Sequence, residues 1–159
     1  MTTQAAKEGC DILILPECLD LGWTHPSSLD EAQPVPGPHN DYIAALAKEH
    51  GIFICCGLTE KEGERIYNKA VLIDDRGEIL LKYRKINVLE VALPMYDVGD
   101  RLGVVDTKFG RIGLNICSDN YVDALDIGFV LGRMGAQVIL SPSSWTVDYS
   151  VTEKSDPYG

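Results

Sequence analysis

Short apolar runs alternate with turn residues and one clearly amphipathic stretch in the first half of the chain. The runs DILILP at 11–16 and IFICCGL at 52–58 are continuous and bounded by proline or glycine, which is typical of strands buried on both faces. Between them, residues 39–50 place apolar side chains three and four positions apart and stop before Gly51, which predicts a helix. Residues 18–38 hold four prolines and predict a long loop.

The second half of the chain predicts two hairpins followed by a helix and a strand. Each hairpin consists of two apolar runs around a short turn that contains glycine. The runs are 67–74 with 78–85 around Asp75-Arg76-Gly77, and 102–109 with 112–117 around Gly110-Arg111; a helix at about 121–134 and a strand at 137–141 follow. This order predicts an α/β fold in which helices pack against mixed sheets.

Composition and charge narrow the class of protein. The chain has 159 residues, enough for one domain, and 45% of them are hydrophobic, which predicts a packed core. The formal net charge of -10 argues against nucleic acid or an anionic membrane as partner. No apolar run is long enough to span a bilayer, and residues 1–9 lack the apolar centre of a signal peptide, so a cytoplasmic location is expected.

The five cysteines do not form CxxC pairs, which disfavours both a disulfide scaffold and a zinc ribbon. Cys55 and Cys56 lie inside an apolar run and are expected in the core, whereas Cys10 and Cys18 flank the first strand. The sequence also lacks a Walker loop, a GxGxxG motif and an HExxH motif. We therefore expect neither a metal nor an organic cofactor.

Three chemically capable residues each follow a predicted strand, where the sites of α/β sheets are usually built. Cys117 comes just before a predicted helix, whose N-terminus would lower the thiol pKa, and the N–H of Ser118 could bind an oxyanion. Glu17 could act as a general base and Lys85 could stabilise negative charge. Taken singly, each has a plainer explanation: a buried structural cysteine, a solvated loop glutamate and a surface lysine.

Four segments in order change that balance. The chain resembles the nitrilase superfamily of carbon–nitrogen hydrolases in ILPE at 14–17, YRK at 83–85, GLNICSD at 113–119 and SPSSW at 141–145. The resemblance covers nearly the whole chain and implies an αββα sandwich with mixed sheets. It also implies a catalytic triad of Glu17 as base and acid, Lys85 as oxyanion stabiliser and Cys117 as nucleophile.

The activity implied is hydrolysis of a non-peptide carbon–nitrogen bond through a Cys thioester. The substrate would be a small amide, carbamoyl compound or nitrile, and no cofactor is required. Relatives commonly pair through helices, so a homo-oligomer is also implied. Glu90 is the best candidate for the second glutamate of some relatives, Asp97 is the second choice, and Asp119 matches an acidic residue that orients the site.

The sequence departs from the family pattern in residues and in length. Asn87 stands where many relatives have histidine, and Asp123-Ala124 where many have Pro-Glu. The chain begins near the end of the family's first helix and stops soon after 141–145, so we expect residues 1–159 to form a single partial domain, truncated at both ends. Two alternatives remain: a non-catalytic fragment that acts in pairing or oligomerisation, and a generic ligand-binding α/β domain with a buried Cys117.

Overall fold

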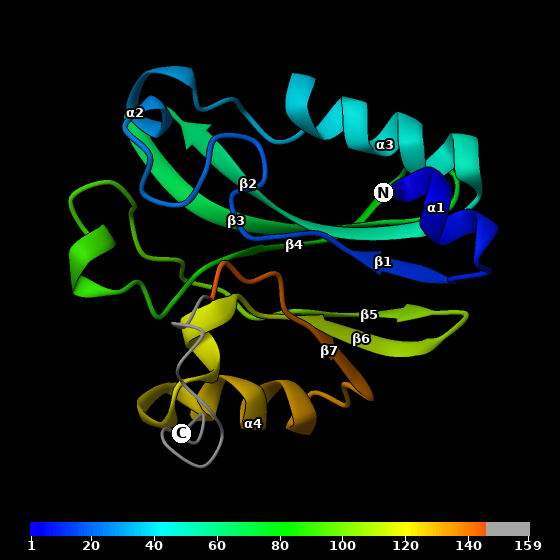
Figure 1. The fold of residues 1–159 in the computed structure, drawn as a ribbon. Helices are drawn as coiled ribbons and strands as arrows, with labels where there is room; N and C mark the ends of the chain where they lie inside the picture. Colours follow the sequence, from blue (N-terminus) through cyan, green and yellow to red (C-terminus); the bar gives the residue numbers. More distant parts are fainter. Residues whose placement is uncertain (146–159) are drawn as a thin grey trace, which may run out of the picture.

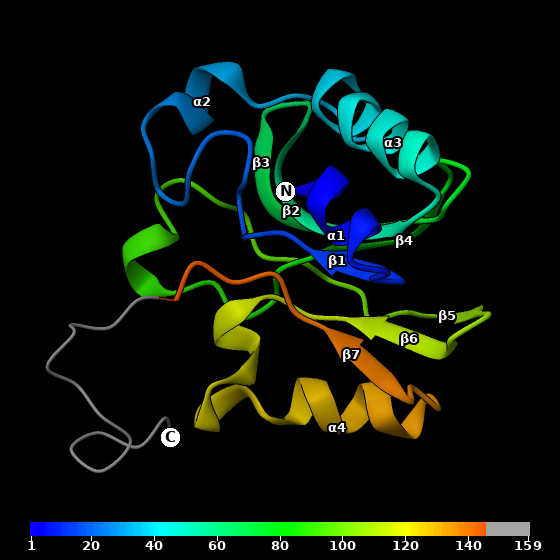
Figure 2. The same cartoon turned by 45° about the vertical axis from the view of Figure 1, so that its right-hand side comes forward.

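The computed structural model describes residues 1–145 as four stacked layers. In Figure 1 the helices α1 (Thr2–Lys7) and α3 (Pro38–His50) lie above a four-stranded sheet, and a three-stranded sheet lies below it. Helix α4 (Asp126–Arg133) covers the outer face of the second sheet, as the turned view in Figure 2 also shows. The expected αββα sandwich is therefore confirmed.

The first sheet has the order β1-β2-β3-β4. Its strands are β1 (Ile12–Ile14), β2 (Phe53–Glu62), β3 (Arg65–Ile73) and β4 (Ile79–Arg84). β1 runs parallel to β2, and the pairs β2–β3 and β3–β4 are antiparallel. The sheet is mixed because a helix connects its first two strands and short turns connect the others.

The second sheet has the order β5-β6-β7, with β5–β6 antiparallel and β6–β7 parallel. Its strands are β5 (Val104–Thr107), β6 (Gly110–Leu114) and β7 (Val138–Leu140). The short helices are α2 (Ser27–Glu31), η1 (Glu90–Ala92), η2 (Cys117–Asn120) and η3 (Val122–Ala124). The turn η2 leads directly away from β6, which places the nucleophile candidate at the end of this sheet.

Side-chain alternation along β2 and β3 divides the interior into two cores. Ile54, Cys56 and Leu58 of β2 join Val71 and Ile73 of β3 in the core under the helices. The intervening residues of both strands face the second sheet, and this core contains Phe53, Cys55, Ala70, Leu72, Ile112 and Leu114. The first sheet therefore has one face toward the helices and one toward the second sheet.

Several boundaries differ from the sequence-based prediction. β1 lies at a sheet edge rather than being buried on both faces, and Ile14 is 47% exposed. The loop predicted at 18–38 contains α2, and the helix predicted at 121–134 is split into η3 and α4. These differences arise because a strand's neighbours, and not its own apolar run, decide how much of it is buried.

The hairpins in the structure also differ from those that the sequence predicted. β2 and β3 form a hairpin that the sequence did not predict, because β2 continues through polar residues to Glu62. The predicted hairpin of β3 and β4 is confirmed, with Gly77 at φ 85° in its turn. In the second sheet the turn lies at Lys108-Phe109, and Gly110-Arg111 begin β6 instead.

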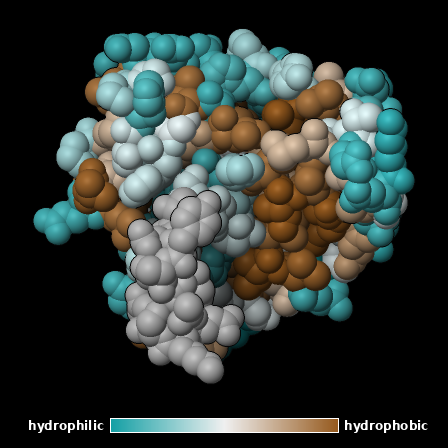
Figure 3. All heavy atoms as spheres, in the orientation of Figure 1, coloured by the Kyte–Doolittle hydropathy of each residue, from teal (hydrophilic) through white to brown (hydrophobic). Residues whose placement is uncertain are grey.

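One face of the molecule gathers apolar side chains. Figure 3, in the orientation of Figure 1, shows a hydrophobic area between the front edges of the two sheets, where β1 and β7 lie. Ile14 of β1 and Val138 and Ile139 of β7 are partly exposed.

No helix in the described part of the chain has both the length and the apolar character needed to cross a membrane.

Candidate active site

The chain segments after β1, β4 and β6 bring Glu17, Lys85 and Cys117 to one end of the sandwich. The segment that carries Glu17 lies directly against β2: the N–H of Gly57 donates to the carbonyl of Pro16, and the N–H of Leu19 donates to the carbonyl of Gly57. A Cβ at position 57 would lie 2.5 Å from the Glu17 Cα. Glycine is therefore required in β2 for Glu17 to approach the sheet this closely.

The carboxylate of Glu17 is buried, and each of its oxygens accepts from a donor on a different segment. Oε1 accepts from Nζ of Lys85 at 2.7 Å and from Nδ2 of Asn68 at 2.6 Å. Oε2 accepts from the backbone N–H of Ser144 at 3.0 Å. Lys85 is also buried, so this ion pair is shielded from water and its geometry is fixed by the surrounding chain.

Cys117 begins η2 with φ 44°, a left-handed conformation that costs energy for a residue with a side chain. Strain of this kind is often found where a reactive side chain must be presented at a sharp turn. Cys117 and Glu17 line the same cavity of about 160 Å³, and Ser144 completes its polar wall. Lys85 is bonded to Glu17, and its positive charge acts on the Cys117 thiol.

The thiol of Cys117 is less acidic than the sequence predicted. Burial raises its pKa, the negative charge of Glu17 raises it further, and the positive charge of Lys85 opposes both. The expectation of a lowered pKa was wrong because η2 is a single short turn with little dipole, whereas the carboxylate and the low-polarity surroundings act directly. A neutral thiol beside a carboxylate needs that carboxylate as a base.

The turn after Cys117 is fastened to the segment after Lys85. Asp119 accepts from the N–H of Ile116 at 2.8 Å, the hydroxyl of Tyr83 at 2.8 Å and the N–H of Asn87 at 2.7 Å. Burial raises the pKa of Asp119, and these donors oppose that shift. Asp119 thus ties together the two segments that carry the lysine and the cysteine.

Ser118 and Asn87 reinforce the same connection. The Ser118 hydroxyl donates to the carbonyl of Asn87 at 2.6 Å, and Nδ2 of Asn87 donates to the carbonyl of Ser118 at 2.7 Å. The asparagine that replaces the histidine of many relatives is therefore a structural link here. Ser118 is fully buried, so its side chain is used in holding the turn.

The remaining wall of the cavity is apolar. It consists of Trp23 from the loop before α2, Leu89 from the segment after β4, and Tyr121 and Trp145 beyond the nucleophile turn. The rings of Tyr121 and Trp145 lie with centroids 4.7 Å apart. A thiol, a carboxylate and an aromatic wall around a small cavity suit a small, largely uncharged acyl group.

The comparisons with known proteins identify the family of the chain. The family model described as carbon–nitrogen hydrolase matches residues 1–156. The chain belongs to the carbon–nitrogen hydrolase family.

Individual relatives share the family but are longer. A nitrilase of Pyrococcus abyssi is 32% identical over 153 residues, covering 92% of this chain and 57% of that protein. The omega-amidase NIT2 of Mus musculus is 26% identical over 157 residues, covering 92% of this chain and 56% of that protein. The chain thus spans little more than half the length of these relatives.

Solved structures show the same fold. An amidase from Nesterenkonia sp. superimposes with a TM-score of 0.82 at 21% identity, covering 94% of this chain and 57% of that one. A carbon–nitrogen hydrolase from Helicobacter pylori G27 superimposes with a TM-score of 0.80 at 21% identity, covering 97% of this chain and 56% of that one.

Two of the predicted supporting residues lie elsewhere in this carbon–nitrogen hydrolase fold. Glu90 begins η1, is exposed and does not line the cavity of Glu17 and Cys117, so the structure does not bring it into the site. Asp97 accepts from the N–H of Ile66 at 3.3 Å and lies 4.0 Å from Nε of Arg65. Both were chosen as acidic residues between the lysine and cysteine segments, and that choice could not show which side chains of this segment face the cavity.

The other cysteines are not placed for catalysis. Cys10 is exposed, and Cys18, Cys55 and Cys56 are buried, as expected for the pair inside β2. Burial raises the pKa of Cys18 and of Cys56 to about 12. Across residues 1–145 no group of three or more His, Cys, Asp or Glu side chains is arranged to hold a metal ion.

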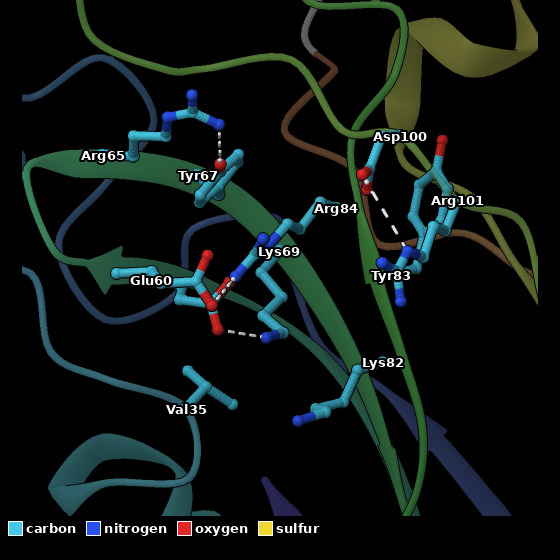
Figure 4. Close-up of a pocket in the computed structure, with 11 residues that line it drawn as sticks. Val35, Glu60, Arg65, Tyr67, Lys69, Lys82, Tyr83, Arg84, Asp100 and Arg101 are labelled. Carbon is cyan, nitrogen blue, oxygen red and sulfur yellow. Dashed lines mark hydrogen bonds and ion pairs between the residues drawn. The ribbon is translucent and has the colours of Figure 1, made fainter.

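A second, larger cavity of about 500 Å³ lies around a charged cluster (Figure 4). Glu60 of β2 accepts from Lys69 of β3 through Oε1 and from Nε of Arg84 of β4 through Oε2 at 2.6 Å. Arg84 also pairs with Glu62 at 2.9 Å and lies 3.8 Å from the ring centroid of Tyr67. These charges already pair with one another, and no cysteine lines this cavity.

Sequence reasoning missed two residues that hold Glu17. Asn68 lies inside a predicted strand and carried no signal beyond being a polar residue in an apolar run. Ser144 lies within the SPSSW segment that carried the resemblance, so that segment could have drawn attention to it. The Ser144 hydroxyl also donates to the carbonyl of Glu17 at 3.0 Å.

Proposed function

We propose that the protein hydrolyses the carbon–nitrogen bond of a small amide, with Cys117 as nucleophile, Glu17 as general base and acid, and Lys85 as oxyanion stabiliser. The observation that carries this proposal is the cavity that Glu17 and Cys117 line together, with Lys85 bonded to Glu17. Residues 1–159 would form one partial hydrolase domain, and the described residues 1–145 contain all three of these side chains.

The first half-reaction forms a thioester. Sγ of Cys117 attacks the amide carbon while its proton passes to Glu17, which is needed because the raised pKa keeps the thiol protonated. Lys85 has three N–H donors and uses one of them in the hydrogen bond to Glu17. The other two can bind the oxyanion together with the N–H of Ser118. Glu17 then protonates the leaving nitrogen as the C–N bond breaks, and ammonia or an amine departs.

The second half-reaction releases the acid. A water molecule attacks the thioester carbon and gives its proton to Glu17. The C–S bond then breaks, and the proton returns from Glu17 to the sulfur of Cys117. The cycle consumes one water molecule and restores both side chains, so its balance needs no metal or organic cofactor.

An amide is favoured over a nitrile by the names of the relatives. Several similar proteins are omega-amidases, whereas the relative from Pyrococcus abyssi is a nitrilase. A structure of a mutant of the Nesterenkonia sp. AN1 amidase shows the result of Michael addition of acrylamide at the active-site cysteine. By analogy, a small amide fits the cavity beside Cys117, and two or more copies of the chain could assemble as the family resemblance implies.

The alternative is a non-catalytic chain that acts through pairing. The apolar side chains along β1 and β7 favour it, because partly exposed sheet edges pair readily with other polypeptides. In that case Cys117 would be present but would not turn over substrate.

The deciding experiment compares Cys117→Ala with Cys10→Ala in amide hydrolysis, with circular dichroism as the check on folding. Loss of the nucleophile should reduce the rate on the order of 10⁴-fold or more, whereas loss of the exposed Cys10 should leave it unchanged. Equal rates in the two folded variants would rule out the proposed nucleophile. No turnover in the parent chain, with a concentration-dependent oligomer, would favour the pairing role.

A further inference from the structure

Asn68 makes an unusual use of a buried amide. Its side chain is 1% exposed, and Nδ2 donates to Oε1 of Glu17 at 2.6 Å. Oδ1 of the same amide is buried without a hydrogen-bond partner among the described residues. The unsatisfied Oδ1 costs free energy that an apolar residue at this position would not cost. The hydrogen bond from Nδ2 to Glu17 is therefore what the asparagine contributes.

The backbone of Asn68 also contributes to the site. Its carbonyl accepts from the N–H of Lys85 at 2.9 Å, where β3 lies beside the end of β4. Asn68 alternates with Lys69 along β3, so its side chain faces the second sheet and the cysteine while that of Lys69 faces the helices. One residue therefore touches the lysine through its main chain and the glutamate through its side chain.

We propose that Asn68 is a positioning residue which, together with Lys85, occupies Oε1 of Glu17 and so reserves Oε2 for exchanging the proton with Cys117. This inference rests on the proposed function. Two donors that reach one oxygen from different side chains hold the carboxylate in place more firmly than Lys85 alone, which contacts it at a single atom. Oε2 accepts the N–H of Ser144 and keeps a further lone pair for the proton.

The neutral amide suits this role because it stabilises the charged carboxylate at every pH without adding a charge of its own. Removing the donor makes the carboxylate hold its proton up to a higher pH. The labelling of Cys117 by a small electrophile that depends on Glu17 as base should therefore begin at a higher pH. A role confined to packing would lower stability without moving this midpoint.

The test measures iodoacetamide labelling of Cys117 by mass spectrometry across pH in the whole chain. The acid limb of the labelling rate in the parent chain supplies the reference midpoint. In Asn68→Leu this midpoint should move upward by roughly one pH unit, as expected when a carboxylate loses one hydrogen bond. Asn68→Asp has nearly the same shape and, when ionised, replaces the donor by a second negative charge, so it should move the midpoint further in the same direction.

Asn40→Leu is the matched control. Asn40 is also a buried amide with an unsatisfied Oδ1, but it lies in α3 away from the site, so its replacement should leave the midpoint unchanged. Equal midpoints in the parent chain, Asn68→Leu and Asn68→Asp, with all three folded, would overturn the role of Asn68 alone. Labelling of Cys117 that is no faster than that of buried Cys55 and has no acid limb would overturn the proposed function itself.

Discussion

The two faces of the first sheet each bury one lysine–glutamate pair, and the pairs differ in what surrounds them. On the face toward the second sheet, Lys85 and Glu17 meet beside a thiol and a cavity of about 160 Å³. On the face toward the helices, Lys69 and Glu60 meet beside Arg84. Asn68 and Lys69 are neighbours on β3 but join different pairs, because successive side chains of a strand point to opposite faces.

The difference lies in how the second oxygen of each glutamate is used. Arg84 occupies Oε2 of Glu60 at 2.6 Å, so this carboxylate is bound by cations at both oxygens. Oε2 of Glu17 is bound by no cation among the described residues; it accepts the backbone N–H of Ser144, and Cys117 is close enough for the carboxylate to raise its pKa. A buried carboxylate whose two oxygens both bind cations is thus a structural link. A buried carboxylate with one oxygen able to receive a proton is a candidate catalytic base.

The first prediction compares the replacement of each lysine by methionine. Lys85→Met should lower the rate of amide hydrolysis roughly 10²–10³-fold, since it removes the proposed oxyanion donor and the partner of Glu17. Lys69→Met, on the neighbouring strand, should change the rate per folded molecule less than about twofold, because it lies on the other face. Steady-state kinetics with active-site titration measures both, and similar losses in the two variants would break the comparison.

The second prediction concerns stability. Glu60→Gln should lower the free energy of unfolding by about 3 kcal/mol, because buried Lys69 loses its counter-charge and burial already lowers the pKa of that lysine. Glu62→Gln removes an exposed partner of the same Arg84 and should leave the free energy of unfolding nearly unchanged. Urea denaturation measures both values; an equally small cost for Glu60→Gln would show that the cluster is not structurally important.

The third prediction concerns the pH dependence of Cys117. The charge of Glu17 raises the thiol pKa, so Glu17→Gln should lower it and move the alkaline phase of iodoacetamide labelling downward by roughly one pH unit. The same variant should lose amide hydrolysis, because it lacks the base. Glu60→Gln should move neither the alkaline phase nor the acid limb, and a shift of similar size there would mean that the two pairs are coupled.

The smallest effect is expected at Ser144. Ser144→Ala removes the hydroxyl that donates to the Glu17 carbonyl but keeps the N–H that donates to Oε2. We expect a loss of about 1 kcal/mol in unfolding free energy and less than a tenfold change in rate. Ser144→Pro also removes the N–H, so a larger loss of rate in that variant would separate the contribution of the backbone donor.

The sequence by itself determined the class of fold and the three candidate catalytic residues. Apolar runs and turn residues are local signals, so the strands that precede Glu17, Lys85 and Cys117 could be located from them. The family resemblance added the order of the segments, and the matching family model confirmed the family. Polar residues at the end of β2 hid its pairing with β3, because an apolar run shows only the buried part of a strand.

Only the tertiary structure decided which hydrogen bonds hold these residues and how their surroundings shift the pKa of the thiol. Asn68 and Ser144 reach Glu17 across 51 and 127 residues of sequence, so no local pattern could connect them. The raised pKa of Cys117 depends on burial and on a carboxylate from another strand, whereas the sequence showed only a helix beginning nearby. Proximity between distant segments sets hydrogen bonds and electrostatic fields, and chain order alone does not specify that proximity.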